Sequence, residues 1–184
     1  MPKLYLVRHG EAAAGWTEDP DPGLSIRGRE QARELADALV GLLSPMPVIT
    51  SPLRRTRETA DALAHRWGMA AEIEPAVGEV PTPEGTPLED RGTWLRDFME
   101  SAWSDASPDL LAWRAGVIDA LSSLGHDALV VTHYVAINTV VGEAEANDRV
   151  INFRPGNCSI TVVEREDAHF RVIERGAQAN TLVL

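Results

Sequence analysis

Three segments of the chain share one pattern, in which a short apolar run ends at polar residues and leads into a helix-like stretch. They are LYLVRHGE (residues 4–11), PVITSPLRRTRETADAL (residues 47–63) and DALVVTHYVAIN (residues 127–138). Short β-branched and aliphatic runs predict buried strands, and strands that alternate with helices predict a parallel sheet with helices on both faces. We therefore expect a three-layer α/β/α fold with a mostly parallel central sheet.

Two other segments depart from this pattern. Residues 158–176 alternate apolar and polar side chains around a turn near residues 166–168, which predicts a C-terminal β-hairpin that extends the sheet. Residues 80–106 carry three prolines, several acids and two tryptophans, and their apolar residues from Trp94 to Trp103 fit one amphipathic helix. This insertion is either a lid or substrate wall over the active-site edge, or a connecting helix packed on the core.

Length and apolar patterning limit the classes of protein to consider. At 184 residues the chain has the size of one domain, so we expect residues 1–184 to form a single domain. No apolar run approaches the length that spans a bilayer, and Arg8 and His9 interrupt the first run too early for a signal peptide. We expect a cytoplasmic protein with no membrane partner.

Net charge and cysteine content further limit the class of partner and the cellular compartment. A formal net charge of −11 argues against nucleic acid as a partner, because nucleic-acid binders usually present a basic surface to phosphates. The single cysteine, Cys158, cannot form an internal disulfide, which fits a reducing compartment. No histidine pair has the spacing of a zinc site and no nucleotide-binding glycine motif is present, so we expect no metal and no cofactor. The sequence does not predict the oligomeric state.

Charged residues follow each of the three predicted strands. The carboxyl ends of parallel strands open into one crevice, so Arg8 and His9, the stretch 51–55, and His133 should meet there. The planar fork of arginine matches phosphoryl oxygens, and a neutral imidazole beside positive charge can attack phosphorus. The pattern predicts a site for a phosphoryl group.

The helix that follows the second strand carries two adjacent arginines. Neighbouring helical residues point about 100° apart, so only one of Arg54 and Arg55 can readily reach the crevice. We expect Ser51 to be the N-cap of this helix, with Pro52 at its first position.

Four blocks in order resemble one known family. LVRHGEA at Leu6, LSIRGREQA at Leu24, TSPLRRTRETA at Thr50 and VVTHYVAIN at Val130 resemble the histidine phosphatase superfamily, also called the phosphoglycerate mutase-like proteins. The blocks run from the first strand to about residue 138, which is most of the chain. A single Arg-His-Gly triplet would be weak, whereas four ordered blocks are specific.

The resemblance implies roles for individual residues. His9 matches the histidine that becomes phosphorylated, and Arg8 and Arg55 match arginines that bind the phosphate. His133 matches the second histidine, which contacts the phosphoryl group. The family's proton donor corresponds to Glu79 in VGEV, with Glu84 as a rival.

The chain also departs from the family pattern. Gly15 stands where many members have an asparagine, Tyr134 stands where a glycine often follows the second histidine, and VPTPEGTP replaces the usual stretch after the acid. These departures affect the expected substrate more than the expected nucleophile.

Taken together, the residues and the resemblance predict a metal-independent phosphomonoesterase with a phosphohistidine intermediate. Its partner is a small phosphorylated substrate or a phosphoprotein. The alternatives are a phosphoglycerate mutase-type phosphoryl transfer, a protein phosphohistidine phosphatase, and a non-catalytic phosphate-binding module.

Overall fold

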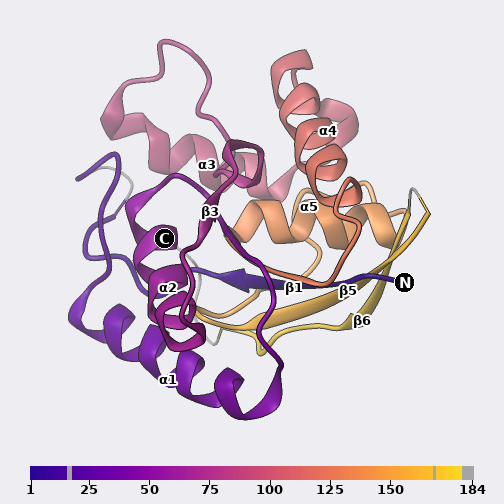
Figure 1. Cartoon of the computed structure of the whole chain (residues 1–184). Coiled ribbons are helices and arrows are strands. Elements are labelled where there is room, and N and C mark those ends of the chain that lie inside the picture. The colour runs from indigo at the N-terminus through magenta and orange to yellow at the C-terminus, as the bar shows by residue number, and fades with distance from the viewer. Residues whose placement is uncertain (16–17, 168, 180–184) are drawn as a thin grey trace.

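The computed structural model describes residues 1–15, 18–167 and 169–179 as a sheet with helices on both faces (Figure 1). The strands lie in the order β3-β2-β4-β1-β5-β6. Their bounds are Lys3–Arg8 (β1), Val48–Thr50 (β2), Glu72–Ile73 (β3), Ala128–Thr132 (β4), Ile160–Glu166 (β5) and His169–Glu174 (β6). The helices are Ile26–Leu42 (α1), Arg54–Ala64 (α2), Arg91–Glu100 (α3), Pro108–Ser122 (α4) and Tyr134–Ala144 (α5), with short 3₁₀ turns at His65–Trp67 (η1), Pro75–Val77 (η2), Leu88–Asp90 (η3) and Trp103–Asp105 (η4).

The sheet is parallel on one side and antiparallel on the other. Strands β1, β2, β3 and β4 run parallel to one another, while β5 runs antiparallel to β1 and forms a hairpin with β6. This confirms the predicted α/β/α fold with its mostly parallel sheet and C-terminal hairpin. Part of the turn predicted between the hairpin strands, Ala168, lies outside the described residues.

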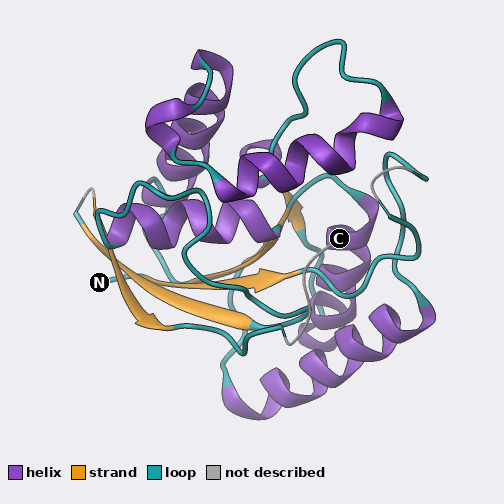
Figure 2. Cartoon of the chain, turned by 180° about the vertical axis from the view of Figure 1, so that it is seen from behind, coloured by secondary structure: helices purple, strands orange, loops and turns teal. Residues whose placement is uncertain are grey.

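The central strand β4 shows why helices cover both faces. Its five residues are all buried, as its continuous apolar sequence requires. Ala128 and Val130 belong to the cluster formed with α4 and α5, and Leu129 and Val131 belong to the cluster formed with α1 and α2. Seen from behind, the same layers are clear, with helices above and below the orange strands (Figure 2).

Segment 80–106 forms a third apolar cluster beside the start of α5. Leu95 and Phe98 of α3 pack in this cluster with Val80, Tyr134 and other residues. The predicted helix is shorter than expected, because Trp103 lies beyond α3 in the 3₁₀ turn η4 and packs edge-on against Phe98 at 5.5 Å between ring centroids. The segment is thus anchored next to the carboxyl end of β4. Among the described residues, no helix has both the length and the apolarity to cross a membrane.

Candidate active site

A cavity of about 660 Å³ opens at the carboxyl ends of β1, β2 and β4. Its lining includes Arg8 at the end of β1, His9 directly after β1, and Arg55 of α2. Glu79 and Tyr134 also line it. Residues far apart in the sequence meet here because parallel strands end at the same edge of the sheet. The strand-end residues that we expected to converge do lie together.

His9 presents one ring nitrogen to this cavity. Its Nδ1 lies 2.7 Å from the Gly10 carbonyl oxygen, which can only accept a hydrogen bond, so Nδ1 carries the hydrogen. The Nε2 atom therefore keeps its lone pair, and Arg55 Nε donates to it at 3.2 Å. This is the tautomer that a nitrogen nucleophile needs.

The electrostatic environment keeps His9 uncharged. Burial lowers the pKa of the His9 imidazole well below its usual value, and His133, Arg55 and Arg8 lower this pKa further. Both effects disfavour a further positive charge in a site that already holds two guanidinium groups. At neutral pH the imidazole is free to attack an electrophile.

Of the two adjacent arginines of α2, only Arg55 enters the cavity. Its guanidinium side chain is 7% exposed, and Nη2 lies 3.3 Å from His133 Nδ1 and 3.7 Å from Glu79 Oε2. Arg54 is exposed and pairs with Glu58 at 3.5 Å on the helix surface. The helical rotation between them produces this difference.

Arg8 is held by its surroundings in a fixed orientation. Its Nη1 donates to the Pro155 carbonyl oxygen at 2.9 Å, and its guanidinium lies over the Tyr134 ring at 5.0 Å from the centroid. Tyr134, which in the sequence is only a departure from the family pattern, thus supports a phosphate-binding candidate. No sequence pattern indicated this contact, because the two residues lie in separate elements.

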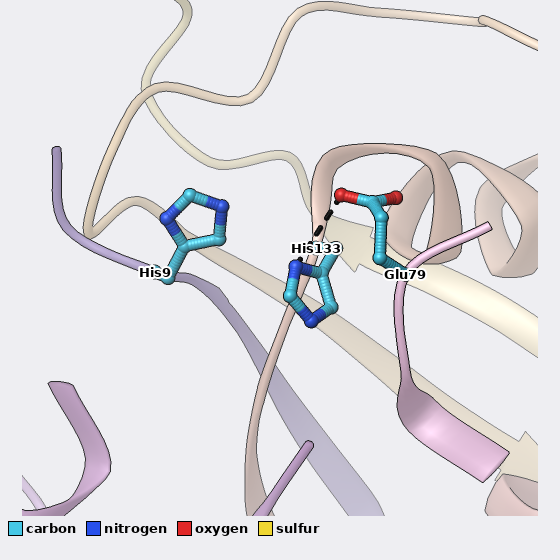
Figure 3. A group of neighbouring side chains, drawn as sticks. All are labelled: His9, Glu79 and His133. Atoms are coloured by element: carbon cyan, nitrogen blue, oxygen red, sulfur yellow. Dashed lines mark ion pairs between the residues drawn. The ribbon is translucent and has the colours of Figure 1, made fainter. Parts of the chain in front are cut away.

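His133 and Glu79 form a buried pair beside His9 (Figure 3). His133 Nδ1 lies 3.3 Å from Glu79 Oε2, and the rings of His9 and His133 are 5.3 Å apart. The segment that carries Glu79 is tied to β4, because Thr132 Oγ1 donates to the Val77 carbonyl oxygen at 2.6 Å. Glu84, the rival proton donor, is exposed and does not line the cavity.

Burial and neighbouring charges have opposing effects on the pKa values of Glu79 and His133. Burial alone would raise the pKa of the Glu79 carboxyl, but His133 and Arg55 outweigh burial and hold this pKa below its ordinary value. Burial lowers the pKa of His133, and the Glu79 carboxylate opposes this effect. In the resting site Glu79 is therefore a carboxylate.

The expectation that Ser51 caps helix α2 is wrong. The helix begins at Arg54 with Leu53 as its N-cap residue. The Ser51 hydroxyl accepts a hydrogen bond from Leu53 N at 3.3 Å, before the helix begins, and it also lies 2.8 Å from His133 Nε2, on the side of the ring away from Glu79. Ser51 is buried at the end of β2, next to β4, so its side chain orients the second histidine.

Two further residues hold the backbone around the nucleophile. Gly10 N donates to Thr59 Oγ1 at 3.0 Å, and Asn157 Nδ2 donates to the His9 carbonyl oxygen at 3.0 Å. Asn157 precedes β5, and an antiparallel β5 must start beside the point where β1 ends. That topological rule could have pointed to Asn157, whereas Thr59 looks like any polar residue of a helix.

The loop after His9 also packs tightly against the first turn of α1. A Cβ atom built on Gly28 would lie 2.1 Å from the Glu11 carbonyl oxygen and 3.0 Å from Glu11 N. Both contacts are backbone atoms, which cannot move aside as a flexible side chain can. Only glycine permits this approach.

We predict that Gly28→Ala destabilises the protein by about 1–3 kcal/mol, the usual cost of overpacking, although alanine favours helices. Displacement of the loop by about 1 Å should also lower kcat, since such shifts can cost about 100-fold. The matched control is Gly41→Ala in the same helix, where a new Cβ meets nothing within 4 Å. Thermal unfolding and turnover of both variants check this, and a stable, fully active Gly28→Ala would contradict it.

The same side chains also have to be considered as a metal site. Ligand atoms of His9, Glu79 and His133 lie within 4.8 Å of one another. However, Arg55 Nε donates to His9 Nε2, Arg55 Nη2 lies 3.3 Å from His133 Nδ1, and the positive charge of Arg55 repels a cation. The arrangement fits an anion better than a metal ion.

Comparison with known proteins identifies the family. A family model described as histidine phosphatase superfamily (branch 1) matches residues 4–178. The chain belongs to the histidine phosphatase superfamily. The resemblance seen in the four sequence blocks is thereby confirmed.

Relatives within this superfamily include proteins with different names. The uncharacterized protein Rv0525 of Mycobacterium tuberculosis is 30% identical over 154 residues, covering 75% of this chain and 76% of that protein. A probable phosphoglycerate mutase, GpmB of Erwinia tasmaniensis, is 28% identical over 193 residues, covering 91% of this chain and 87% of that protein. The superfamily members similar to this chain thus include mutase-like proteins.

Solved structures share the fold. The mycobacterial glucosyl-3-phosphoglycerate phosphatase solved with VO₃ has a TM-score of 0.75 at 21% identity, over 97% of this chain and 100% of that one. A putative alpha-ribazole-5'-P phosphatase from Escherichia coli has a TM-score of 0.74 at 20% identity, over 99% of this chain and 100% of that one. At these identities the likeness establishes the histidine phosphatase fold, and the substrate has to be argued from the site.

Proposed function

We propose that this protein is a metal-independent phosphomonoesterase that works through a phosphohistidine on His9. The observation that carries the proposal is the state of the His9 ring. Its Nδ1 is bound to the Gly10 carbonyl oxygen, while Nε2 is unprotonated and directed at Arg55 in the cavity. An imidazole held this way is a nucleophile placed where arginines can bind a phosphoryl group.

In the first step, the Nε2 lone pair of His9 forms a bond to phosphorus. The bond between phosphorus and the ester oxygen breaks, and its electron pair stays on the leaving oxygen. Arg8, Arg55 and His133 bind the remaining phosphoryl oxygens, where charge gathers in the transition state. Arg55 is already within hydrogen-bond reach of Nε2, so it lies beside the bond that forms.

Glu79 is the group that we propose protonates the leaving oxygen. Its pKa is low in the resting site, but a bound phosphate dianion brings negative charge close to the carboxylate. Like charges disfavour ionisation, so substrate binding raises the pKa of Glu79 and loads it with a proton. The carboxyl can then give this proton to the departing alkoxide.

In the second step, water attacks the phosphohistidine. The Glu79 carboxylate takes a proton from the water, the oxygen–phosphorus bond forms, and the phosphorus–nitrogen bond breaks. Its electron pair returns to Nε2, so free histidine and inorganic phosphate result. Glu79 then carries a proton again, as it did in the substrate complex, and releases this proton to solvent when phosphate leaves, which restores the resting carboxylate.

The test is to trap the intermediate. Wild-type protein is mixed with p-nitrophenyl phosphate carrying ³²P, with chelator present, and quenched in alkali, where phosphohistidine is stable. We expect a label that is lost in acid and that mass spectrometry locates at His9. A label on another residue, or turnover that chelator abolishes and a divalent metal restores, would overturn the proposal.

A second candidate is phosphoglycerate mutase activity, because the relative GpmB carries that name. A mutase returns the phosphoryl group to a hydroxyl of the same substrate and releases little phosphate. Incubation with 3-phosphoglycerate, followed by assays for 2-phosphoglycerate and for free phosphate, separates the two activities. If the substrate is a phosphoprotein, turnover appears only when a panel of phosphoproteins is tested. If the protein is a non-catalytic binding module, it binds phosphate and forms no product.

We also propose that the protein works in a reducing compartment such as the cytoplasm. Its single cysteine, Cys158, is partly buried, and burial raises the pKa of this thiol to about 12. A thiol of such high pKa is a poor nucleophile in disulfide exchange. Cys158 should therefore stay reduced in any compartment, so the location is checked by fractionating cells and detecting the protein with an antibody.

A further inference from the structure

The cavity extends beyond the reach of a phosphoryl group. Its volume of about 660 Å³ lies in the range of sites for small organic ligands. Part of its lining, a wall formed by segment 80–106 directly after Glu79, consists of Val80, Thr82, Arg91 and Met99. The part of a substrate that leaves with the ester oxygen has to fit against this wall.

Arg91 differs from the other arginines that are not exposed. Arg8, Arg114 and Arg165 each donate a hydrogen bond to a named oxygen, and Arg55 bonds to His9. Arg91 lines the cavity but its side chain has no hydrogen bond or ion pair with a described residue, and this is the difference, because the Nε atoms of Arg8, Arg114 and Arg165 are buried without a partner just as that of Arg91 is. Arg91 is partly buried and has no counter-charge among the described residues, so an anionic group of a ligand in the cavity can pair with it without displacing a protein carboxylate.

The remaining charges of segment 80–106 do not compensate Arg91. The acids of this segment are exposed and absent from the cavity lining: Glu84, Glu89, Asp90, Asp97, Glu100 and Asp105. Because they lie outside the cavity, these acids do not oppose an anion at Arg91 from within it. Besides Glu79, the acids that line the cavity are Glu11, Glu18 and Asp19, which come from the segment after β1.

We propose that Arg91 binds a second anionic group, a carboxylate or a phosphate, on the leaving part of the substrate. This inference rests on the proposed phosphatase function and assigns its substrate class: phosphomonoesters of hydroxy acids or of other phosphorylated alcohols. The planar fork of arginine matches both groups, which is why one residue serves for either. The anion at Arg91 orients the ester oxygen toward Glu79.

Matched ligand pairs test this assignment. Phosphoglycolate and ethyl phosphate differ by one carboxylate, and 1,3-propanediol bisphosphate and propyl phosphate differ by one phosphate. For each pair, the ratio of kcat/KM values gives the preference for the charged member. We expect a preference in at least one pair, and a loss of about 10- to 100-fold of that preference in Arg91→Ala, the range of one charge-assisted hydrogen bond.

Arg96→Ala is the matched control, because Arg96 lies on the exposed side of the same helix and outside the cavity. It should keep the wild-type preference, and Arg91→Lys should keep part of it. Should Arg91→Ala fail to fold, Arg91→Gln, which keeps most of the side-chain stem, replaces it. The proposal is overturned if neither pair shows a preference or if Arg91 variants keep it.

A binding measurement separates this inference from the phosphatase proposal. Calorimetric titration of the same four compounds into His9→Ala, with and without Arg91→Ala, reports recognition without turnover. Loss of the charged preference in the double variant supports the role of Arg91 even when wild-type protein shows no hydrolysis. Equal affinities for both members of each pair in His9→Ala would overturn it while leaving the phosphatase activity standing.

Discussion

His9→Ala is expected to lower kcat for p-nitrophenyl phosphate by at least about 10,000-fold, as loss of a covalent nucleophile does in other enzymes. The variant loses the Nε2 lone pair that the structure aims into the cavity, and no other described nucleophile takes its place. Steady-state phosphate release, with chelator present throughout, measures the effect. Because Arg8 and Arg55 remain in the cavity to bind the phosphate, KM for the substrate should change much less than kcat.

The control for this experiment is His169→Ala. His169 is exposed at the start of β6, outside the cavity, so its removal should leave kcat within about twofold. Circular dichroism of both variants shows that they are folded. Activity of His9→Ala within tenfold of wild type would mean that phosphoryl transfer does not pass through this histidine.

Glu79→Gln is expected to separate substrates by their need for a proton. For an alkyl phosphate, whose alkoxide is a poor leaving group, kcat/KM should fall by about 100- to 10,000-fold, the usual worth of general acid catalysis. For p-nitrophenyl phosphate the loss should be at least tenfold smaller, since p-nitrophenolate is a stable anion and departs without a proton. The ratio kcat/KM is used because it reports only the steps up to and including the departure of the leaving group from phosphorus.

The pH profile gives a second readout of the same residue. Attack needs neutral His9, whose pKa is lowered, so activity is lost only as the pH falls far into the acid range. Protonation of the leaving group needs Glu79 in its acid form, so activity on alkyl phosphates declines as the pH rises through the pKa of Glu79 in the complex. We therefore expect an acidic optimum in wild type and loss of the alkaline decline in Glu79→Gln.

Glu84→Gln is the control, since Glu84 was the rival proton donor and is exposed. It should keep both the substrate dependence and the pH profile of wild type. Equal losses on both substrates in Glu79→Gln would show that Glu79 acts by holding His133 and Arg55 in place. A large effect in Glu84→Gln would require this segment to rearrange during catalysis.

Much of the fold and the centre of the site could be predicted from the sequence, because both follow from local patterns. The continuous apolar run of β4 shows that both faces of the sheet are covered, and short strands that alternate with helices show that it is parallel. Once the strands are parallel, their carboxyl ends coincide. The sequence alone therefore predicts that His9, Arg55 and His133 meet at one edge of the sheet.

The supporting contacts depended on the tertiary structure, because each joins elements distant in sequence through a side chain of ordinary type. Ser51 has the sequence context of a helix cap, yet its hydroxyl lies against His133. Gly28 looks like a helix residue of low propensity, yet it gives the nucleophile loop the space it needs. Neither role leaves a periodic signal in the sequence.

The leaving-group side of the cavity shows the same limit. Segment 80–106 has the composition of an acidic surface insertion, and the sequence could not decide which of its charges face the site. Packing of Leu95 and Phe98 against the start of α5 sets the rotation of α3, and this rotation places Arg91 at the cavity while the acids face solvent. The sequence by itself determined the sheet, the nucleophile and the phosphate-binding chemistry, because strand patterning and strand ends are local properties. Only the tertiary structure decided which side chains contact those residues, because these contacts depend on packing between elements that are distant in sequence.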